Sequence, residues 1–310
     1  MNEYLDCVTL GDCFEHLPRL ADDSLHCFVS DIPYGIGADT WDVLHANTNS
    51  ALLGQSPAQV GKTAFKWRGK SIRGWSAADR NIPHEYQAWC EQWATAVYPK
   101  LKEGVSLFIF CARRTLHRAL VALEDSGFLL RDILVWEKPN AHHRAQRLSG
   151  ILEKRGEPLQ AEKWQGWRLG NLAPTWEPIA WFFKPYQHTI TDVVLQNEVG
   201  ALNIAEAQVE GKSPSNILRF WFAPTEKRVH EMQKPVALLE FLIRLTTREG
   251  HTVLDPFMGS GSTAIACRNL NRHFIGFEID PQNVALANQR LAVPSESSAT
   301  DTPRHLPFLP

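Results

Sequence analysis

Short β-rich runs alternate with helical patterns along most of this chain, and that alternation constrains its fold more than any other feature. Strands separated by crossover helices form a parallel sheet, so we expect an α/β architecture. The expected strands are Leu25–Ser30, Ser106–Cys111, Ile133–Trp136, Ile179–Phe183, Thr252–Leu254 and Phe274–Phe277. The expected helices are His84–Tyr98, Thr115–Asp125, Pro235–Thr247, Ser262–Leu270 and Pro281–Leu291. Ser262 is expected to be the N-cap of its helix.

The composition is that of an ordinary globular domain. The 310 residues are 44% apolar and 21% charged, which supplies ample material for a core. No apolar run approaches the roughly 20 residues that a membrane span needs. The acidic start Met1–Asp6 lacks the basic region of a secretory signal, and the six cysteines are scattered without a CxxC pair. We therefore expect a cytoplasmic protein with no membrane partner and no structural zinc site.

Two long segments interrupt the alternation of strands and helices. Gly35–Pro83 is too long for a simple loop in a compact α/β unit, and Lys138–Pro178 is also irregular. After Val293 the chain is rich in Ser, Thr and Pro, and we expect this tail to be disordered.

A glycine turn near the C-terminus carries the first functional signal. Residues 251–263, HTVLDPFMGSGST, have the pattern of a strand, a tight turn and a helix start. Gly259 and Gly261 lack a Cβ, so the backbone can bend sharply and a ligand can approach it closely. Glu278 ends the next expected strand, where a carboxylate can accept hydrogen bonds from both hydroxyls of a ribose. These features predict an adenosine-bearing cofactor across the carboxyl ends of the strands.

The turn alone leaves two alternatives open. A short GxG is a weak signal, and the segment can be a tight turn followed by a solvated acid. Gly259–Ala264 also matches the G-x-G-x-x-A pattern of dinucleotide-binding proteins, although only one βαβ unit follows it. A P-loop is excluded because no Gly-Lys-Ser/Thr follows at the required spacing.

A second signal lies at the end of the first expected strand, in Asp31-Ile32-Pro33-Tyr34. Pro33 forces Ile32 into an extended conformation and removes one backbone donor. The Ile32 carbonyl is then free to point outward beside the Asp31 carboxylate, and two adjacent acceptors suit an exocyclic NH₂ group. Tyr34 supplies an aromatic face for a base taken out of its helix. The alternative is an ordinary strand-ending turn, because Asp-x-Pro-Tyr-Gly is also good turn chemistry.

Such a pair of acceptors suits methyl transfer to nitrogen. The lone pair of an adenine or cytosine amine is delocalised into the ring, which makes the amine a poor nucleophile. Hydrogen bonds from both N–H groups to Asp31 and the Ile32 carbonyl favour a more tetrahedral nitrogen, whose lone pair can point at an electrophilic methyl group. This chemistry needs no metal, and no ligand cluster in the sequence suggests one.

Taken together, these motifs resemble those of the amino-methylating DNA methyltransferases that use S-adenosylmethionine. Asp31–Tyr34 is similar to their catalytic Asp-Pro-Pro-Tyr motif, and Leu254–Ser262 is similar to their cofactor motif. The catalytic motif comes first, as in the β group of that family. Gly11–Cys13 resembles the group's adenine-contacting motif, and His230–Pro235 resembles the segment before its glycine motif.

The resemblance implies an α/β, doubly wound, mostly parallel sheet of the Rossmann-like methyltransferase type. The order of the motifs implies that this fold is permuted, so that the cofactor turn comes late, and that DNA-recognition segments are inserted into it. The implied organisation is a catalytic domain over residues 1–292, with DNA-facing inserts at about 37–82 and 138–228. The remaining residues, 293–310, are the expected disordered tail.

The resemblance also implies a role for individual residues. Asp31 and the Ile32 carbonyl are expected to bind the target amine, with Pro33 restricting the geometry and Tyr34 stacking on the flipped base. Ile32 stands where the family usually has proline, and since the contact there is a backbone carbonyl we expect activity to survive. Asp12 and Cys13 are expected near the adenine of the cofactor and Glu278 near its ribose. Lys234 is expected near the carboxylate of the methionine half. The residues expected along the rest of that half are Phe257, Gly259, Ser260 and Gly261, with Asp255 in the same motif.

DNA binding must come from local basic patches, because the net charge of the chain is −2. Gly61–Ser76 carries five cations and no acid, interleaved with aromatic side chains that can stack or wedge, and the second irregular segment adds two arginines. The alternative for both segments is a solvated surface over packed tryptophans. The expected DNA-binding residues are Lys62, Lys66, Arg68, Lys70, Arg73, Arg144 and Arg147.

The sequence therefore predicts a site-specific DNA methyltransferase that acts on the exocyclic amine of a flipped base. Adenine N6 is preferred because the tetrad begins with Asp, whereas the family's cytosine-N4 enzymes more often begin with Ser. The expected partner is double-stranded DNA; a cognate restriction endonuclease and a monomer or homodimer are compatible with the sequence. The alternatives are a cytosine-N4 methyltransferase, an NAD-dependent oxidoreductase, and a DNA-binding protein with a degenerate cofactor site.

Overall fold

An eight-stranded sheet forms the centre of the computed structural model, which describes residues 3–35, 77–138, 146–170, 172–209, 211–229 and 232–293. The strand order is β1-β10-β9-β2-β3-β7-β4-β8, and every neighbouring pair is parallel except those of β7, which runs antiparallel to both β3 and β4. The mostly parallel α/β sheet predicted from the sequence is thus confirmed. Its strands are β1 (Cys7–Leu10), β2 (Cys27–Asp31), β3 (Ser106–Phe110), β4 (Leu129–Glu137), β7 (Trp176–Phe183), β8 (Ile217–Leu218), β9 (Thr252–Asp255) and β10 (His273–Glu278).

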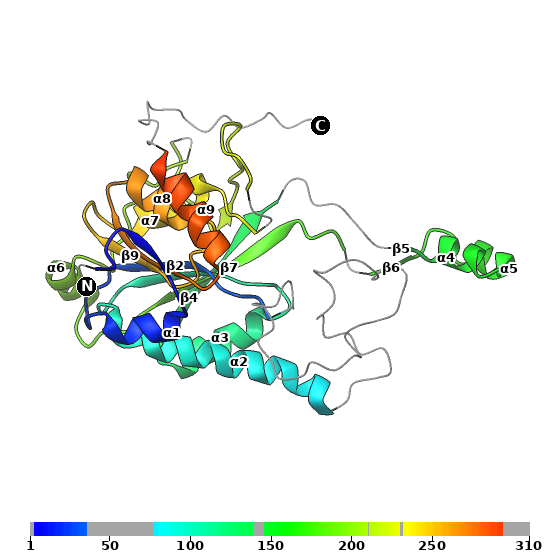
Figure 1. Cartoon of the computed structure of the whole chain (residues 1–310), viewed down its shortest axis with the longest axis horizontal. Coiled ribbons are helices and arrows are strands. Elements are labelled where there is room, and N and C mark those ends of the chain that lie inside the picture. Colours follow the sequence, from blue (N-terminus) through cyan, green and yellow to red (C-terminus); the bar gives the residue numbers. More distant parts are fainter. Residues whose placement is uncertain are drawn as a thin grey trace.

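Helices cover both faces of this sheet (Figure 1). Neighbouring strand residues point to opposite faces, so Phe28 packs in the cluster that holds Trp93 of α2, whereas Val29 packs in the cluster that holds Leu242 of α7. Because both faces are covered, the central strands β2, β3 and β9 are buried along almost their whole length rather than at every second residue. One layer contains α1 (Cys13–His16), α2 (Ala77–Val97) and α3 (Leu116–Asp125), and the other contains α7 (Val236–Thr246), α8 (Ser262–Asn269) and α9 (Pro281–Ala292).

The segment between β4 and α7 is divided between the sheet and an arm. Residues 176–183 and 217–218 lie within the main sheet as β7 and β8, and α6 (Ile190–Asn197) begins with a capping box at Thr189. Figure 1 shows residues 146–170 standing away from the sheet as an arm. This arm consists of β5 (Gln146–Arg147), α4 (Leu148–Lys154), α5 (Pro158–Lys163) and β6 (Arg168–Leu169). Both ends of the arm join strands at the edge of the sheet where β2 also ends.

One predicted helix cap is wrong. Ser262 is the first residue of α8, and the N-cap is Gly261, which has a φ of +82° and makes no side-chain capping hydrogen bond. The Ser262 hydroxyl accepts a hydrogen bond from Arg290 instead, at 3.1 Å. The predicted strands and longer helices are otherwise present, with ends that differ by a few residues at most places.

No helix within the described ranges is both long enough and apolar enough to cross a membrane.

A stacked histidine pair predicts how stability depends on pH. The rings of His26 and His251 are 4.3 Å apart, and Nδ1 of His26 accepts a hydrogen bond from the backbone N–H of Thr252. Burial, with the nearby charge of His251, lowers the pKa of His26 from 6.5 to about 4. The unfolded chain binds this proton more strongly than the native state, so stability is complete above pH 6.5 and is lost as the pH falls towards 4.

We expect His26→Asn, which keeps an acceptor for the Thr252 N–H, to make the stability less dependent on pH over that window. The difference in slope should approach about 1.4 kcal/mol per pH unit, the value for one proton. Urea unfolding at a series of pH values measures both slopes. Equal slopes for the variant and the wild type would show that His26 does not carry this effect.

Candidate active site

The early Asp-Ile-Pro-Tyr corner and the late glycine turn meet at one cavity of about 250 Å³. Both follow parallel strands, β2 and β9, which are paired neighbours in the sheet, so their carboxyl ends lie side by side. The two motifs therefore share one site, as expected if the cofactor and the target amine are to react there. The predicted residues that line the cavity are Asp12, Cys13, Asp31, Pro33, Lys234, Asp255, Phe257, Gly259, Ser260 and Glu278.

Asp255 joins the two motifs directly. Its buried carboxylate accepts hydrogen bonds of 2.6 Å from the hydroxyl of Ser30, 225 positions away in the chain, and of 2.6 Å from that of Thr263. The backbone N–H of Phe257 donates a third bond at 3.2 Å. Burial raises the pKa of Asp255 to about 6, and the donated hydrogen bonds oppose that rise. Although Asp255 lines the cavity, its carboxylate is engaged in holding the turn against β2.

The two glycines of the turn serve different purposes. Gly259 has a φ of +54°, and its N–H donates a hydrogen bond of 2.7 Å to the Glu278 carboxylate. Gly261 does not line the cavity; a Cβ there would lie 2.8 Å from the Cβ of Ala287 in α9. Gly261 is thus required by the close approach of α9 to the turn, a packing role that the sequence did not indicate.

Glu278 ends β10 and Asp12 follows β1, and both residues line the cavity. The two oxygens of the buried Glu278 carboxylate accept hydrogen bonds from the backbone N–H groups of Gly259 and Asp280, at 2.7 and 2.8 Å. Each oxygen keeps a second lone pair for a ligand hydroxyl. Asp12 is the N-cap of α1, and burial raises the pKa of the neighbouring Cys13 thiol to about 12, so this cysteine is a neutral wall residue.

Asp31 forms an ion pair with Lys234, whose side chain is 6% exposed. The ammonium of Lys234 also donates to the Tyr34 hydroxyl at 3.4 Å and to the Met232 carbonyl at 3.2 Å. Burial raises the pKa of Asp31, and the charge of Lys234 opposes the rise. Lys234 lies two residues before α7, which packs against β2, and it both lines the cavity and pairs with Asp31. Its expected role at the cofactor carboxylate stays a prediction.

The two carboxylate oxygens of Asp31 differ in their hydrogen-bond partners. Oδ1 is buried and has no hydrogen-bond partner among the described residues, while Oδ2 is held by Lys234. A buried carboxylate oxygen without a donor is costly, and such orphans are typical of sites that bind a ligand. The free acceptor lies on a residue that lines the same cavity as the glycine turn.

The remaining residues of the tetrad are held by the helices of the α2–α3 layer. The carbonyl of Pro33 accepts from the Tyr86 hydroxyl at 3.1 Å, and that of Tyr34 accepts from the Thr115 hydroxyl at 2.9 Å. Ile32 is 1% exposed and packs in the core. The Tyr34 ring is 6% exposed and does not line the cavity, so stacking on a base stays a prediction.

Glu177 and Lys138 were not predicted, and both lie at this edge of the sheet. Glu177 is in β7, Lys138 follows β4, and their side chains form an ion pair. One carboxylate oxygen of Glu177, Oε2, is buried without a partner among the residues described. Burial alone raises the pKa of Glu177, but the charges of Lys234 and Lys138 outweigh it and lower the pKa. An apolar strand pattern carries no direction, so the sequence could not show that β7 begins, rather than ends, at this edge.

Most of the predicted DNA-binding residues cannot be compared with the structure. Lys62, Lys66, Arg68, Lys70, Arg73 and Arg144 lie outside the described residues. Arg147 is exposed on β5 of the arm, directly opposite Arg168 of β6.

Within the described ranges, no group of three His, Cys, Asp or Glu side chains could hold a metal ion.

Comparisons with known proteins identify the class to which this site belongs. The model of the DNA methylase family, which covers N6 and N4 methyltransferases, matches residues 25–289. The type II methyltransferase M.HindIII of Haemophilus influenzae is 46% identical over 296 residues, 93% of this chain and 96% of that protein. The type II methyltransferase M.HinfI of the same species is 21% identical over 94% of this chain and 69% of its own length.

Solved structures agree on the fold. The PvuII DNA methyltransferase, described as cytosine-N4-specific, superposes with a TM-score of 0.60 at 17% identity over 94% of this chain and 89% of its own. The S-adenosylmethionine complex of M1.HpyAVI superposes with a TM-score of 0.55 at 20% identity, over 93% of this chain and 99% of its own.

The protein belongs to the N6/N4 DNA methylase family. It is a DNA amino-methyltransferase of the β group, and the NAD-dependent oxidoreductase alternative finds no support in these comparisons.

The cofactor of this enzyme is S-adenosylmethionine, and the cavity fits that molecule. The Glu278 carboxylate retains acceptor capacity for ribose hydroxyls, and Ile279, 57% exposed, offers an apolar surface to a purine ring. At Gly259 the backbone is bare: a Cβ built there would meet no atom closer than 4.0 Å, which leaves room for close approach.

Ser30→Ala tests whether Asp255 joins the motifs. The variant removes a donor from a buried carboxylate, so we expect a loss of about 1–3 kcal/mol in the free energy of unfolding and weaker binding of S-adenosylmethionine. Denaturant unfolding and equilibrium binding of the labelled cofactor measure the two effects. As a control, Ser24→Ala removes a 2.7 Å bond to a backbone carbonyl at an exposed site away from the cavity. An S30A variant as stable as S24A, with unchanged cofactor affinity, would contradict the role of Asp255.

Proposed function

We propose that this enzyme methylates the N6 amine of adenine, flipped out of double-stranded DNA, at a specific sequence. The observation that carries the proposal is the unpartnered Oδ1 of Asp31, on the wall of the cavity that also holds the cofactor turn. An acceptor there supports binding of an amine N–H beside the bound cofactor.

In this proposal the residues of the corner bind and orient the amine. S-adenosylmethionine supplies the electrophilic methyl group when it is bound. The Asp31 Oδ1 and the Ile32 carbonyl each accept one N–H of the amine, which turns the nitrogen lone pair out of conjugation and towards the methyl carbon. Transfer of the methyl group to the nitrogen would break the S–C bond and leave S-adenosylhomocysteine, and the amine would release one proton to water. The ionised form of Asp31 is the stronger acceptor, and Lys234 stabilises that form.

Adenine is preferred over cytosine because the tetrad begins with Asp, as the sequence resemblance implies. Both amines require the same two acceptors, so the choice is tested by the product rather than by the geometry of Asp31. The type II designation of the two Haemophilus relatives supports a modification enzyme with a cognate restriction endonuclease, and that partner stays a prediction.

Asp31→Asn tests the catalytic role. Asn keeps the shape of Asp but replaces one carboxylate oxygen with an NH₂ group and removes the charge. We expect kcat to fall by about 10²–10³-fold, the range seen when one electrostatic group of an active site is lost, with cofactor affinity within about threefold of the wild type. Asp22→Asn is a matched control, because Asp22 is an exposed partner of Lys100 away from the cavity. An active D31N variant would refute the assigned role.

We also propose that the β5–β6 ribbon of the arm contacts the phosphates of bound DNA. Arg147 and Arg168 are exposed and directly opposite each other across this antiparallel pair, so two guanidinium groups lie on the same face of the ribbon. Guanidinium groups bind backbone phosphates through charge-assisted, often bidentate hydrogen bonds. The arm follows the C-terminal end of β4 and precedes the N-terminal end of β7. Both of these ends lie at the edge of the sheet that carries Asp31.

The double variant Arg147→Ala with Arg168→Ala should bind duplex DNA more weakly, with a salt slope lower by about 1–2, as for the loss of one or two phosphate contacts. Fluorescence anisotropy across a salt series measures both quantities. Arg248→Ala is the control, because Arg248 is exposed and precedes β9 at the opposite edge of the sheet. If the salt slope of the double variant equals that of R248A, the ribbon does not contact DNA phosphates.

A further inference from the structure

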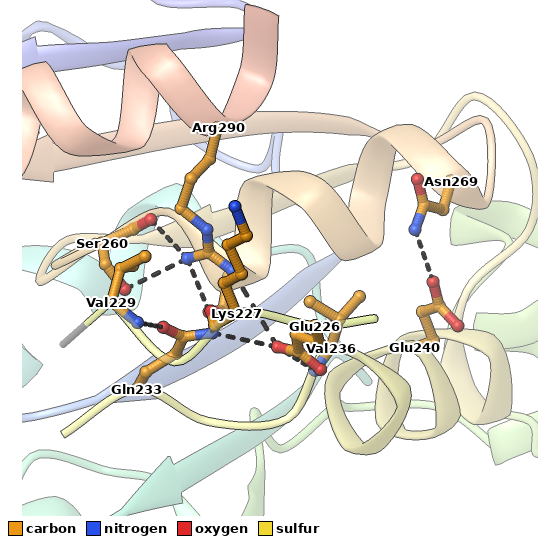
Figure 2. Close-up of polar contacts among 10 residues, drawn as sticks. Glu226, Lys227, Val229, Gln233, Val236, Glu240, Ser260, Asn269 and Arg290 are labelled. Atoms are coloured by element: carbon orange, nitrogen blue, oxygen red, sulfur yellow. Dashed lines mark hydrogen bonds and ion pairs between the residues drawn. The ribbon is translucent and has the colours of Figure 1, made fainter. Parts of the chain in front are cut away.

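Arg290 of α9 reaches the cofactor turn from behind. Its Nη1 donates to the Ser260 carbonyl at 2.6 Å and to the Ser260 hydroxyl at 3.1 Å (Figure 2). It also donates to the Ser262 hydroxyl at 3.1 Å. The Arg290 side chain is 13% exposed and does not line the cavity, whereas both serines do. Arg290 therefore acts on a ligand only through the turn.

The hydrogen bonds from Arg290 fix which way the serine hydroxyls can donate. Each hydroxyl oxygen already accepts from the guanidinium, so its own proton is free to be donated elsewhere. Two serine hydroxyls with free protons beside a buried cation suit a carboxylate. The methionine half of S-adenosylmethionine ends in that group.

Glu226 provides the counter-charge and links Arg290 to the start of α7. Its carboxylate, 12% exposed in the side chain, lies 3.9 Å from Nη2 of Arg290. The same carboxylate accepts from the backbone N–H of Val236, the first residue of α7, at 3.3 Å and from Nε2 of Gln233 at 3.0 Å. Figure 2 shows these groups converging between α9 and the segment before α7.

Lys234 lies between the two residues that Glu226 holds. Gln233 is fixed further by its bonds to the Lys227 carbonyl and the Val229 N–H, at 3.3 and 3.0 Å. The backbone on both sides of Lys234 is thus anchored, and Lys234 in turn contacts Asp31. Polar contacts run from the cofactor turn through Arg290 and Glu226 to Gln233 and Val236, and the backbone between these two residues connects them to Lys234 at Asp31.

We propose that Arg290 is a positioning residue, which prepares Ser260 and Ser262 to donate to the carboxylate of S-adenosylmethionine and, with Glu226, sets that turn in register with Lys234 at Asp31. The inference rests on the proposed placement of the methionine half at the turn. It does not depend on which base is methylated.

The test compares a ligand that has the amino-acid carboxylate with one that lacks it. S-adenosylmethionine carries the carboxylate, whereas 5′-methylthioadenosine has the same adenosine with a neutral thioether in place of the sulfonium and no amino-acid group. The effect of each variant is read for each ligand separately. Calorimetric binding to the wild type, Arg290→Gln and Arg290→Lys, without DNA, gives both affinities for each protein. Arg268→Gln is the matched control: Arg268 of α8 also binds α9, through the carbonyls of Leu291 and Val293 at 2.6 and 2.8 Å, and makes no contact with the turn.

R290Q should weaken S-adenosylmethionine binding by about 10–100-fold, the effect of losing charge-assisted hydrogen bonds, and leave methylthioadenosine binding within about twofold. R290K keeps the charge but lacks the planar guanidinium group, so its affinity for S-adenosylmethionine should lie between those of R290Q and the wild type. R268Q should change neither affinity.

Two results would overturn the proposal. Equal weakening of both ligands by R290Q would mean that Arg290 only holds the fold of the site together, and unchanged binding of both would mean that it does not act on the turn. A thermal unfolding midpoint measured for each variant separates misfolding from either outcome. Methyl transfer to DNA by the wild type is measured separately, so failure of the proposed function is distinguishable.

Glu226→Gln tests the second half of the network. The variant keeps the shape of Glu226 but removes the counter-charge of Arg290 and weakens the anchor of α7 beside Lys234. We expect kcat to fall as well as the affinity for S-adenosylmethionine, and the double variant R290Q/E226Q to lose less than the product of the two single losses. Independent, multiplicative losses would contradict a shared network.

Discussion

The hydrogen bonds of one buried carboxylate set the geometry on which the rest of the site depends. Asp255 accepts from Ser30, the residue before Asp31, and from Thr263, in the first turn of the helix after the glycine turn. Burying an ionised carboxylate is unfavourable unless it is well hydrogen-bonded, so this arrangement is stable only when β2 and the turn of β9 are in register. The catalytic corner and the cofactor turn are distant in sequence, and one set of short contacts fixes them relative to each other.

Charge compensation extends that constraint over the whole edge of the sheet. Lys234 pairs with Asp31, Lys138 pairs with Glu177, and Arg290 faces Glu226, so each of these six charges has an opposite charge nearby. Breaking one such pair leaves an uncompensated charge, which is more costly than the pair itself is favourable. These pairs constrain the edge of the sheet that carries the cavity, and the buried oxygen of Asp31 that lacks a donor is the one that we propose binds the substrate amine.

The sequence predicted the parts of this site that depend on local patterns. The apolar strands, the strand–turn–helix around Gly259 and the position of Glu278 all follow from the residues themselves, and the order of the motifs identified the family. The reversed direction of β7, and with it Glu177, could not be predicted, because an apolar strand has the same pattern in either direction. β1 was missed because only one of its four residues is buried. The contact of Lys234 with Asp31 and the packing of Gly261 against Ala287 depend on how α7 and α9 sit on the sheet. No local pattern encodes those positions.

The central claim is tested most directly by the modified nucleoside itself. The protein is incubated with S-adenosylmethionine labelled in the methyl group and with unmethylated duplex DNA of mixed sequence, and the DNA is then digested to nucleosides and separated. The account predicts that the label is in N6-methyldeoxyadenosine. Label in N4-methyldeoxycytidine would contradict the choice of base, and DNA without label from a folded protein that binds the cofactor would contradict the account as a whole.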